Sequence, residues 1–334
     1  MRAFFDPRQL AHAPAREFAN GRMEACAELP SRAEQILSAI GPAELPRDHG
    51  TAPLLRVHPQ DYLDFLKTAY EEWLAAGREA EAIPYTFPAV RRRGLPLDRI
   101  DARLGRYAYD TCTPIVADTW LSAYWSAQSA LSALQAVLDG DRSAFALCRP
   151  PGHHAGADYF GGYCFLNTAA IAAEAAIAAG RRRVAILDID YHHGNGTQDI
   201  FWTRGDVLFV SIHADPATDY PFYWGHADES GEGEGEGATL NLPLPRGTAM
   251  AQFGRALDQA LDRIAVFAPD LLICSYGADT FEGDPISRFR LKTEDYPEIA
   301  RRIASCGLPT LIVMEGGYAV DALGANVASF LSGF

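Results

Sequence analysis

Four short aliphatic runs, each followed by a polar or glycine-rich turn, constrain the fold of this chain more than any other feature. They occupy residues 181–190, 207–213, 270–279 and 309–317, and a fifth run, 144–152, ends in two prolines and a glycine. Runs of this length are too short for buried helices but suit the central strands of a parallel sheet. In such sheets ligands gather beyond the carboxyl ends of the strands.

Other segments have the pattern of helices. Apolar residues three and four apart, or an alanine-rich composition, predict helices at residues 31–40, 57–78, 114–140 and 167–180. Strands that alternate with helices predict an α/β fold, in which a central, mostly parallel sheet carries helices on both faces. Residues 42–53 and 84–96 combine proline, glycine and charge without periodicity, and we expect surface loops there.

Composition and charge argue against several classes of partner. Hydrophobic residues make up 48% of the chain and charged residues 22%, and no apolar stretch reaches the roughly 20 residues that span a bilayer. The net charge of −14 disfavours nucleic acid and anionic membranes and favours cations, although many enzymes are acidic without having a cationic substrate. The six cysteines form no Cys-x-x-Cys pair and no secretory signal begins the chain, so we expect reduced thiols and a cytoplasmic location.

The stretch ILDIDYHHGNGTQ, residues 186–198, places carboxylates and imidazoles at the end of a predicted buried strand. Side chains two positions apart share one face of an extended strand, so Asp188, Asp190 and His192 would project together. Burying these groups is unfavourable unless a cation offsets the cost. With Asp279, which follows another predicted strand, they predict a catalytic zinc ion that keeps one coordination position open. In the alternative, the carboxylates only cap the turn and His192 is an ordinary core histidine.

Two further motifs also end predicted strands. His153 and His154 follow two prolines and a glycine, and they suit general acid–base catalysis because imidazole titrates near neutral pH. Tyr318 follows two glycines that permit a sharp turn, which would let its phenol donate a hydrogen bond to a developing oxyanion. Either motif alone is compatible with ordinary packing, but beside the metal cluster they predict a catalytic centre.

The motifs PPGHHAG, DIDYHHGNGTQDIF, VSIHADP, GADTFEGDP and EGGY, in this order, resemble those of the metal-dependent deacetylases of the histone deacetylase superfamily. The resemblance is closest to the bacterial acetylpolyamine amidohydrolases and covers nearly the whole chain. It implies an arginase- and deacetylase-like three-layer α/β fold in a single metal-dependent deacetylase domain, residues 1–334. It also implies an entrance loop around residues 80–110 that pairs two chains, and hence a homodimer.

The resemblance assigns two kinds of metal ion. Zn²⁺, with Fe²⁺ as an alternative in the cell, would be bound by Asp190, His192 and Asp279. A structural K⁺ would lie beside it, held partly through backbone carbonyls by Asp188, Asp190, His192, Ser211 and Ile212.

The resemblance also assigns the catalytic groups. The family counterpart of His154 is the general base and acid, that of His153 supports it electrostatically, and that of Tyr318 polarises the substrate carbonyl. Asp188 would hold His153, and Asn195 would hold His154. Animal histone deacetylases of the first class usually carry Asp where Asn195 stands, so this residue groups the chain with the second-class and bacterial branch.

The implied reaction is hydrolysis of the N-acetyl amide of a small cationic amine, such as acetylputrescine, acetylcadaverine or acetylspermidine. A thin aliphatic chain would need a narrow aromatic tunnel, for which Tyr163 and Phe222 are candidates and Trp224 a weaker one, although packing alone would explain each ring. Glu17 matches an acidic position of the family's entrance loop. A further glutamate expected near residues 106–114 is absent, which leaves the preference for polyamines open.

Three other functions remain open at this point. An acetyl-lysine protein or peptide deacetylase of the same family would use the same centre. A ureohydrolase of the arginase type would share the fold, but it binds two manganese ions and has no use for His153, His154 and Tyr318 in this arrangement. A non-catalytic small-molecule binding protein would lack at least one ligand or the tyrosine, and this sequence keeps all of them.

Overall fold

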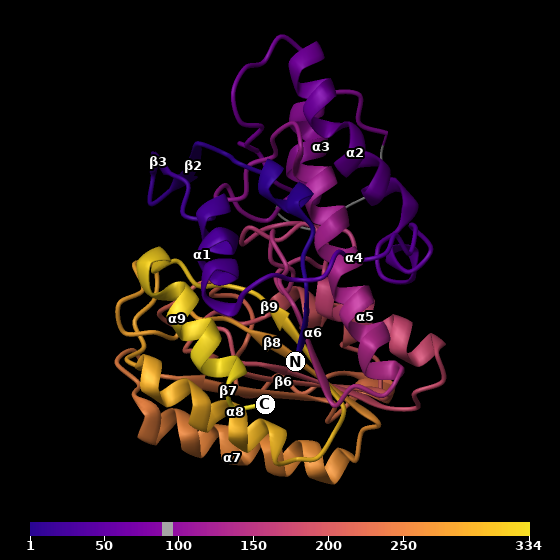
Figure 1. Cartoon of the computed structure of the whole chain (residues 1–334). Coiled ribbons are helices and arrows are strands. Elements are labelled where there is room, and N and C mark those ends of the chain that lie inside the picture. The colour runs from indigo at the N-terminus through magenta and orange to yellow at the C-terminus, as the bar shows by residue number, and fades with distance from the viewer. Residues whose placement is uncertain (89–95) are drawn as a thin grey trace.

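The computed structural model describes residues 1–88 and 96–334. Its centre is a seven-stranded sheet in the order β1-β4-β9-β8-β5-β6-β7 (Figure 1), and every neighbouring pair of these strands is parallel. The predicted α/β fold with a mostly parallel sheet is therefore confirmed. The strands are β1 (Arg2–Phe4), β4 (Ser143–Ala146), β5 (Val184–Asp188), β6 (Val207–Ala214), β7 (Thr239–Leu244), β8 (Leu271–Tyr276) and β9 (Thr310–Met314).

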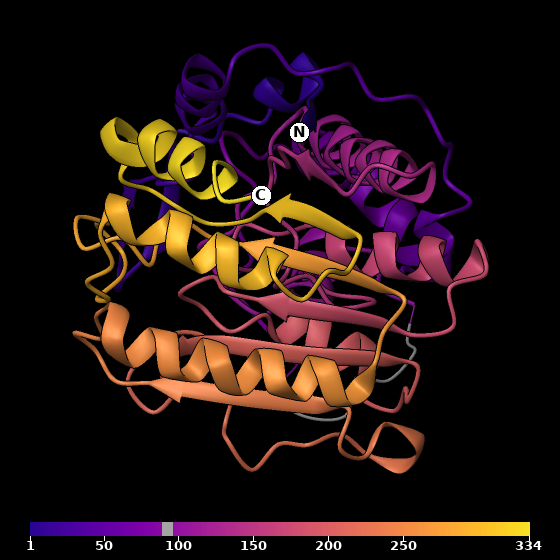
Figure 2. The same cartoon turned by 60° about the horizontal axis from the view of Figure 1, so that its bottom comes forward.

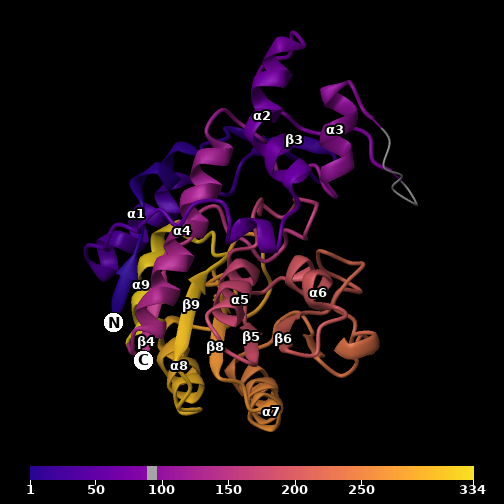
Figure 3. The same cartoon turned by 90° about the vertical axis from the view of Figure 1, so that its right-hand side faces the viewer.

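Helices cover both faces of this sheet and give three layers (Figure 2). One layer consists of α1 (Pro30–Ile40), α7 (Met250–Phe267), α8 (Tyr296–Ala304) and α9 (Val320–Leu331). The opposite layer consists of α4 (Thr119–Leu138), α5 (Thr168–Ala178) and α6 (Asn195–Phe201). At the top of Figure 3 lie α2 (Gln60–Ala75) and α3 (Ile100–Tyr107), which pack against each other, with α2 also contacting α4.

The alternation of side chains along the strands explains the two layers. In β5, Val184 and Ile186 join the core on the side of α4 and α5, whereas Ala185 and Leu187 join the core on the side of α7, α8 and α9. All four side chains are completely buried. A strand that is apolar on both faces is stable only at the centre of a sheet, which is where β5 lies.

The four predicted helices form as α1, α2, α4 and α5, each with its ends shifted from the prediction. Helix α2 begins after Pro59, because the residues before it form a separate 3-10 turn, Leu54–Arg56. Helix α5 begins after Asn167, whose side chain accepts a hydrogen bond from the N–H of Ala170. Side-chain capping of this kind fixes helix ends more sharply than hydrophobic periodicity does.

A separate two-stranded antiparallel hairpin, β2 (Arg16–Ala19) and β3 (Arg22–Ala25), stands apart from the main sheet (Figure 1). The entrance and dimerisation loop expected around residues 80–110 includes residues 89–95, which lie outside the described residues. All six cysteines are free thiols. Within the described part of the chain, no helix combines the length and the apolar character needed to cross a membrane.

Candidate metal centre and active site

Four adjacent strands of the sheet, β4, β9, β8 and β5, carry the sequence motifs to one edge. His153 follows β4, Tyr318 follows β9, Asp279 follows β8 and Asp190 follows β5. Because these strands are parallel, their carboxyl ends open on the same side of the sheet. Motifs that are far apart in the sequence therefore meet in space.

Asp190, His192 and Asp279 form a compact cluster at this edge. Nδ1 of His192 lies 3.3 Å from Oδ1 of Asp190 and 3.0 Å from Oδ2 of Asp279. Both carboxylates are completely buried, and one donor atom from each residue lies within 4.8 Å of the other two. Nitrogen and oxygen ligands bound tetrahedrally at about 2 Å from one zinc ion are roughly 3.3 Å apart, so this donor set fits such an ion.

A turn, and not an extended strand, brings these ligands together. The expectation that the strand continues to His192 is wrong, because β5 ends at Asp188. Oδ1 of Asp188 accepts the N–H of Asp190 (3.1 Å), and Oδ1 of Asp190 accepts the N–H of His192 (2.8 Å). A carboxylate that accepts the N–H two residues ahead closes a local turn. The capping contacts considered as the alternative to metal binding thus exist, and they also orient the candidate ligands.

Two glycines leave the space that the carboxylates occupy. A Cβ atom on Gly277 would lie 2.0 Å from Oδ2 of Asp190, and one on Gly316 would lie 2.6 Å from an oxygen of both Asp190 and Asp279. The N–H of Gly316 also donates to Oδ2 of Asp190 at 2.8 Å. The cradle is therefore shaped to hold two carboxylates, and any larger residue at these glycines would displace them.

The charges in the cluster also favour a cation. Burial disfavours a charged imidazole at His192, but the carboxylates of Asp190 and Asp279 outweigh burial and raise the pKa of His192 to about 10. Burial and the charge of Asp190 raise the pKa of Asp279 to about 7. Two buried carboxylates around one imidazole leave an excess of negative charge, which a divalent ion would neutralise.

His153 and His154 lie side by side, with ring centroids 4.1 Å apart, and each is held by its own partner. Nδ1 of His153 lies 3.0 Å from Oδ2 of Asp188. Nδ1 of His154 lies 2.7 Å from Oδ1 of Asn195. The structure thus brings together both pairs that the family resemblance implied.

The two histidines are held in different charge states. Burial opposes a charge on His153, but the carboxylates of Asp188 and Asp190 outweigh it and raise the pKa of His153 to about 10. Burial and the neighbouring His153 and His192 hold the pKa of His154 well below its usual range. His154 is therefore neutral and free to accept a proton, whereas His153 carries a positive charge beside it.

Tyr318 lies on the sharp turn after β9. Gly317 has a φ of +129°, a conformation that favours glycine, so the turn expected at these glycines is present. The N–H of Tyr318 donates to Oδ2 of Asp284 at 2.6 Å, and the guanidinium of Arg32 lies 4.7 Å from the ring centroid. Burial raises the pKa of the Tyr318 phenol well above its usual range. The phenol is thus protonated and can donate a hydrogen bond.

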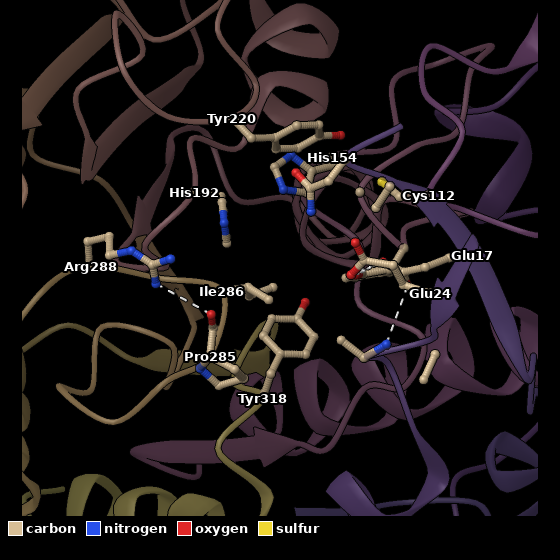
Figure 4. A pocket seen from close by; sticks show the side chains of 16 residues that line it. Glu17, Glu24, Cys112, His154, His192, Tyr220, Pro285, Ile286, Arg288 and Tyr318 are labelled. Atoms are coloured by element: carbon tan, nitrogen blue, oxygen red, sulfur yellow. Dashed lines mark hydrogen bonds between the residues drawn. The ribbon is translucent and has the colours of Figure 1, made fainter. Parts of the chain in front are cut away.

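A cavity of about 340 Å³ opens at these residues (Figure 4), and His154, His192 and Tyr318 line it. Two further tyrosines form part of its wall. The ring of Tyr220 lies edge-on to that of His154, with centroids 5.2 Å apart, and the ring of Tyr163 lies 5.6 Å from that of Tyr318. Aromatic walls of this kind suit a thin aliphatic substrate.

Of the predicted wall residues, Tyr163 lines the cavity and Phe222 does not. Phe222 is 50% exposed, and Tyr220, two residues earlier, takes the expected place. A proline between the two rings turns the chain, so the sequence gives no sign of which ring points inward. Trp224 packs edge-on against Tyr109, with centroids 5.7 Å apart, and also lies outside the cavity lining.

The β2–β3 hairpin supplies the acidic side of the cavity. Its two-residue turn consists of Asn20 and Gly21, both with positive φ, and this turn places Glu17 directly opposite Glu24. Both glutamates line the cavity, and Oε1 of Glu17 accepts a hydrogen bond from the hydroxyl of Tyr163 at 2.9 Å. Glu17 was predicted from the sequence, whereas Glu24 was not. The Asn-Gly pair midway between them is the signal that would have found it.

Glu315 is a further residue of the centre that was not predicted from the sequence. Its Oε2 accepts the N–H groups of Gly152 (2.7 Å) and His153 (3.1 Å), and its Oε1 accepts the hydroxyl of Ser275 (3.1 Å). One possible ligand atom from each of Glu315, His153 and Cys164 lies within 4.8 Å of the other two, which is close enough to hold a metal ion. The hydrogen bonds from Gly152 and His153 show that Glu315 holds the loop that carries His153. The one feature of the sequence that could have indicated this role is the position of Glu315, an acidic residue directly after the aliphatic run of β9.

The residues expected to hold potassium lie on neighbouring strands. Asp188 pairs with Ser211 in the register of β5 and β6, and Ile212 follows directly. The side chain of Ser211 is engaged with Nδ1 of His213 at 2.8 Å, which leaves its backbone carbonyl as the candidate donor.

Comparison with known proteins agrees with this geometry. The histone deacetylase domain family matches residues 18–334. Acetylpolyamine amidohydrolase 1 of Pseudomonas aeruginosa is 52% identical over 325 residues, which cover 95% of this chain and 94% of that protein. The acetylpolyamine amidohydrolase of Mycoplana ramosa is 46% identical over 340 residues, which cover 100% of this chain and 99% of that protein. The crystal structure of acetylpolyamine aminohydrolase from Burkholderia pseudomallei has a TM-score of 0.96 at 45% identity, covering 100% of this chain and 98% of that one.

The family match spans nearly the whole described chain, and these relatives share both its sequence and its fold. The amidohydrolases and deacetylases of this family are hydrolytic enzymes that act on linear amides. The chain therefore belongs to the histone deacetylase family and is an amidohydrolase of this class.

Proposed function

We propose that this enzyme hydrolyses the N-acetyl amides of small cationic amines, such as acetylputrescine, acetylcadaverine and acetylspermidine, to acetate and the free amine. The observation that carries the proposal is a single cavity in which His154, His192 and Tyr318 face the same space as Glu17 and Glu24. The names of the relatives, acetylpolyamine amidohydrolases, support the same substrate class.

The donor set of two carboxylates and one imidazole supports a divalent cation held by Asp190, His192 and Asp279, which we propose to be Zn²⁺, with Fe²⁺ as an alternative in the cell. When bound, this ion would polarise the amide carbonyl and lower the pKa of a water molecule. The pairing of Asp188 with Ser211 supports a structural K⁺ held by Asp188, Asp190, His192, Ser211 and Ile212.

His154 acts as the general base. Oδ1 of Asn195 can only accept a hydrogen bond, so Nδ1 of His154 carries the proton and Nε2 keeps its lone pair. Nε2 removes a proton from the attacking water and later gives that proton to the leaving amine nitrogen. The positive charge on His153, stabilised by Asp188, helps to hold the pKa of His154 low before the reaction. The same charge stabilises the negative charge that develops during attack.

Tyr318 donates its hydroxyl hydrogen to the oxygen of the tetrahedral intermediate. Its protonated, buried phenol lines the cavity beside His154 and His192, where it can reach this oxygen. A well-placed donor of this kind is worth roughly 3–4 kcal/mol in the transition state.

The two glutamates of the hairpin support a cationic far end on the substrate. Glu17 and Glu24 lie directly opposite one another on the hairpin, so an ammonium group between them would contact two carboxylates. Burial raises the pKa of Glu17, which a nearby cation would lower again. The expected single domain and the homodimer built on the loop around residues 80–110 are further proposals supported by the family alone. The expected cytoplasmic location is a proposal supported by the cysteine pattern of the sequence.

Acetate release from acetylputrescine, acetylspermidine and an acetyl-lysine peptide, with the metal quantified in the same preparation, tests the proposal. We expect both acetylated amines to be cleaved faster than the peptide, with about one divalent ion per chain. The matched control is Asp279→Asn, which removes one ligand charge and should abolish release. Preference for the peptide would favour a protein deacetylase, and urea release with two manganese ions would favour a ureohydrolase.

A further inference from the structure

Among the described residues that line the cavity, Arg288 is the one arginine or lysine, and Glu17 and Glu24 are the carboxylates. Glu17 and Glu24 line one side of this cavity, and Figure 4 shows Arg288 on the opposite side, beyond His192. The residue is exposed, so its guanidinium is accessible from the solvent. The cavity therefore offers a substrate one negative side and one positive side.

No carboxylate among the described residues pairs with this guanidinium. Nη1 of Arg288 donates hydrogen bonds to the carbonyl oxygens of Ser287 (2.5 Å) and Pro285 (3.4 Å). By contrast, the exposed Arg22 pairs with Glu24 at 2.7 Å. A guanidinium has five N–H donors, so the Nε and Nη2 groups of Arg288 remain available to a ligand.

The loop that carries Arg288 is tied to the catalytic centre. Asp284 accepts the N–H of Ile286 at 3.0 Å through one oxygen and the N–H of Tyr318 at 2.6 Å through the other. The hydroxyl of Ser287 donates to the carbonyl of Asp279, a candidate metal ligand. These contacts fix the position of the loop relative to the catalytic centre. Arg288 is therefore placed to bind the end of the substrate that lies away from the acetyl group.

We propose that Arg288 binds a carboxylate, and that the enzyme therefore accepts free diamino acids acetylated on the side-chain nitrogen. This inference rests on the proposed deacetylase function and deepens it. The acetamide would lie between His154 and Tyr318, and the far carbon would carry an ammonium group facing Glu17 and Glu24. The same carbon would carry a carboxylate facing Arg288. Arginine binds carboxylates through paired N–H donors, which gives both affinity and orientation.

This geometry distinguishes three substrates that share one acetylated alkyl chain. Nε-acetyl-lysine presents both charges to the cavity, whereas acetylcadaverine is the same molecule without the carboxylate. Nε-acetyl-lysinamide keeps the ammonium group and replaces the carboxylate with a neutral amide. A charge-assisted hydrogen bond is worth about 1.5–3 kcal/mol, or about 10- to 100-fold in kcat/KM.

The test compares kcat/KM for these three substrates in the metal-loaded wild-type enzyme and in Arg288→Gln. We expect the wild type to prefer Nε-acetyl-lysine over its carboxamide by about tenfold or more. Arg288→Gln should lower kcat/KM for Nε-acetyl-lysine by about the same factor and leave acetylcadaverine within about twofold. The matched control is Arg290→Gln, which removes the same charge from an exposed residue outside the cavity lining and should change neither value.

The two proposals fail in different ways. If acetylcadaverine is cleaved but the ratio between Nε-acetyl-lysine and acetylcadaverine is the same in the wild type and Arg288→Gln, the role of Arg288 is refuted and the deacetylase function stands. If Arg290→Gln lowers the ratio as much as Arg288→Gln does, the effect is one of overall charge, and the carboxylate contact is refuted. If none of the substrates releases acetate, the proposed function itself is refuted.

Discussion

The hydrogen-bonding partners of His153 and His154 differ in charge, and this difference contributes to the different charge states of the two histidines. Asp188 and Asn195 each accept a hydrogen bond from Nδ1, at 3.0 Å and 2.7 Å. The aspartate adds a negative charge that favours imidazolium, whereas the amide adds none. This asymmetry lets one histidine supply a fixed positive charge while its neighbour moves a proton.

At the scale of the single residue, Tyr318→Phe tests the oxyanion donor. We expect kcat to fall by about 10²–10³-fold with KM nearly unchanged, because the phenol contributes its hydrogen bond in the transition state and not in the bound substrate. Steady-state kinetics with acetylputrescine measure both constants. Tyr163→Phe serves as the control, since its hydroxyl is bound to Glu17 and its loss should act mainly on KM. Near-normal kcat in Tyr318→Phe would remove this residue from the mechanism.

At the scale of the element, the turn after β9 shapes the metal centre. A Cβ atom on Gly316 would lie 2.6 Å from an oxygen of Asp190 and 2.6 Å from an oxygen of Asp279. We expect Gly316→Ala to push these carboxylates apart and weaken metal affinity by about 10- to 100-fold. Isothermal titration calorimetry, with Zn²⁺ added to the metal-free protein, measures this loss of affinity.

The control for this substitution is Gly180→Ala, at the end of α5. Its Cβ would meet open space, but its φ of +98° strains any larger residue. This variant should therefore lose thermal stability and keep full metal affinity. Equal affinities in Gly316→Ala and Gly180→Ala would show that the glycine cradle does not shape the metal site.

Some elements of the fold and site could be predicted from the sequence, and others could not. The strand that ends at Asp188 was predictable because an unbroken aliphatic run must be buried on both faces. The inward position of Tyr220 was not, since two aromatic rings flank a proline and only tertiary packing selects between them. The opposition of Glu17 and Glu24 depends on a hairpin, which the Asn-Gly turn signals locally. Arg288 reaches the cavity through loop contacts that no periodicity encodes.

At the scale of the whole molecule, the buried His58 makes the stability of the fold depend on pH. His58 is completely buried between two partners: its Nδ1 lies 2.9 Å from the carbonyl of Ala157, and the N–H of Asn167 donates to its Nε2 at 3.0 Å. Burial lowers the pKa of His58 to about 4, whereas the unfolded chain titrates near 6.5. Between these values the unfolded chain binds the extra proton. The free energy of unfolding therefore decreases as the pH falls from about 6.5 to about 4.

His58→Gln removes this titration. Between pH 6 and pH 4.5, the wild type should lose about 1.2 kcal/mol per pH unit more than the variant does. Urea unfolding at several pH values measures both slopes, and any loss of metal in acid is common to the two proteins. Parallel profiles would show that His58 is not held neutral by the fold.

The central claim is that Asp190, His192 and Asp279 together bind one divalent cation. Anomalous diffraction from crystals of the wild-type enzyme, recorded on both sides of the absorption edge of zinc, tests this claim directly. We predict one strong peak at about 2.0–2.2 Å from an oxygen of each aspartate and from Nδ1 of the histidine. A map without a metal peak at these three residues, from crystals grown with zinc present, would contradict it.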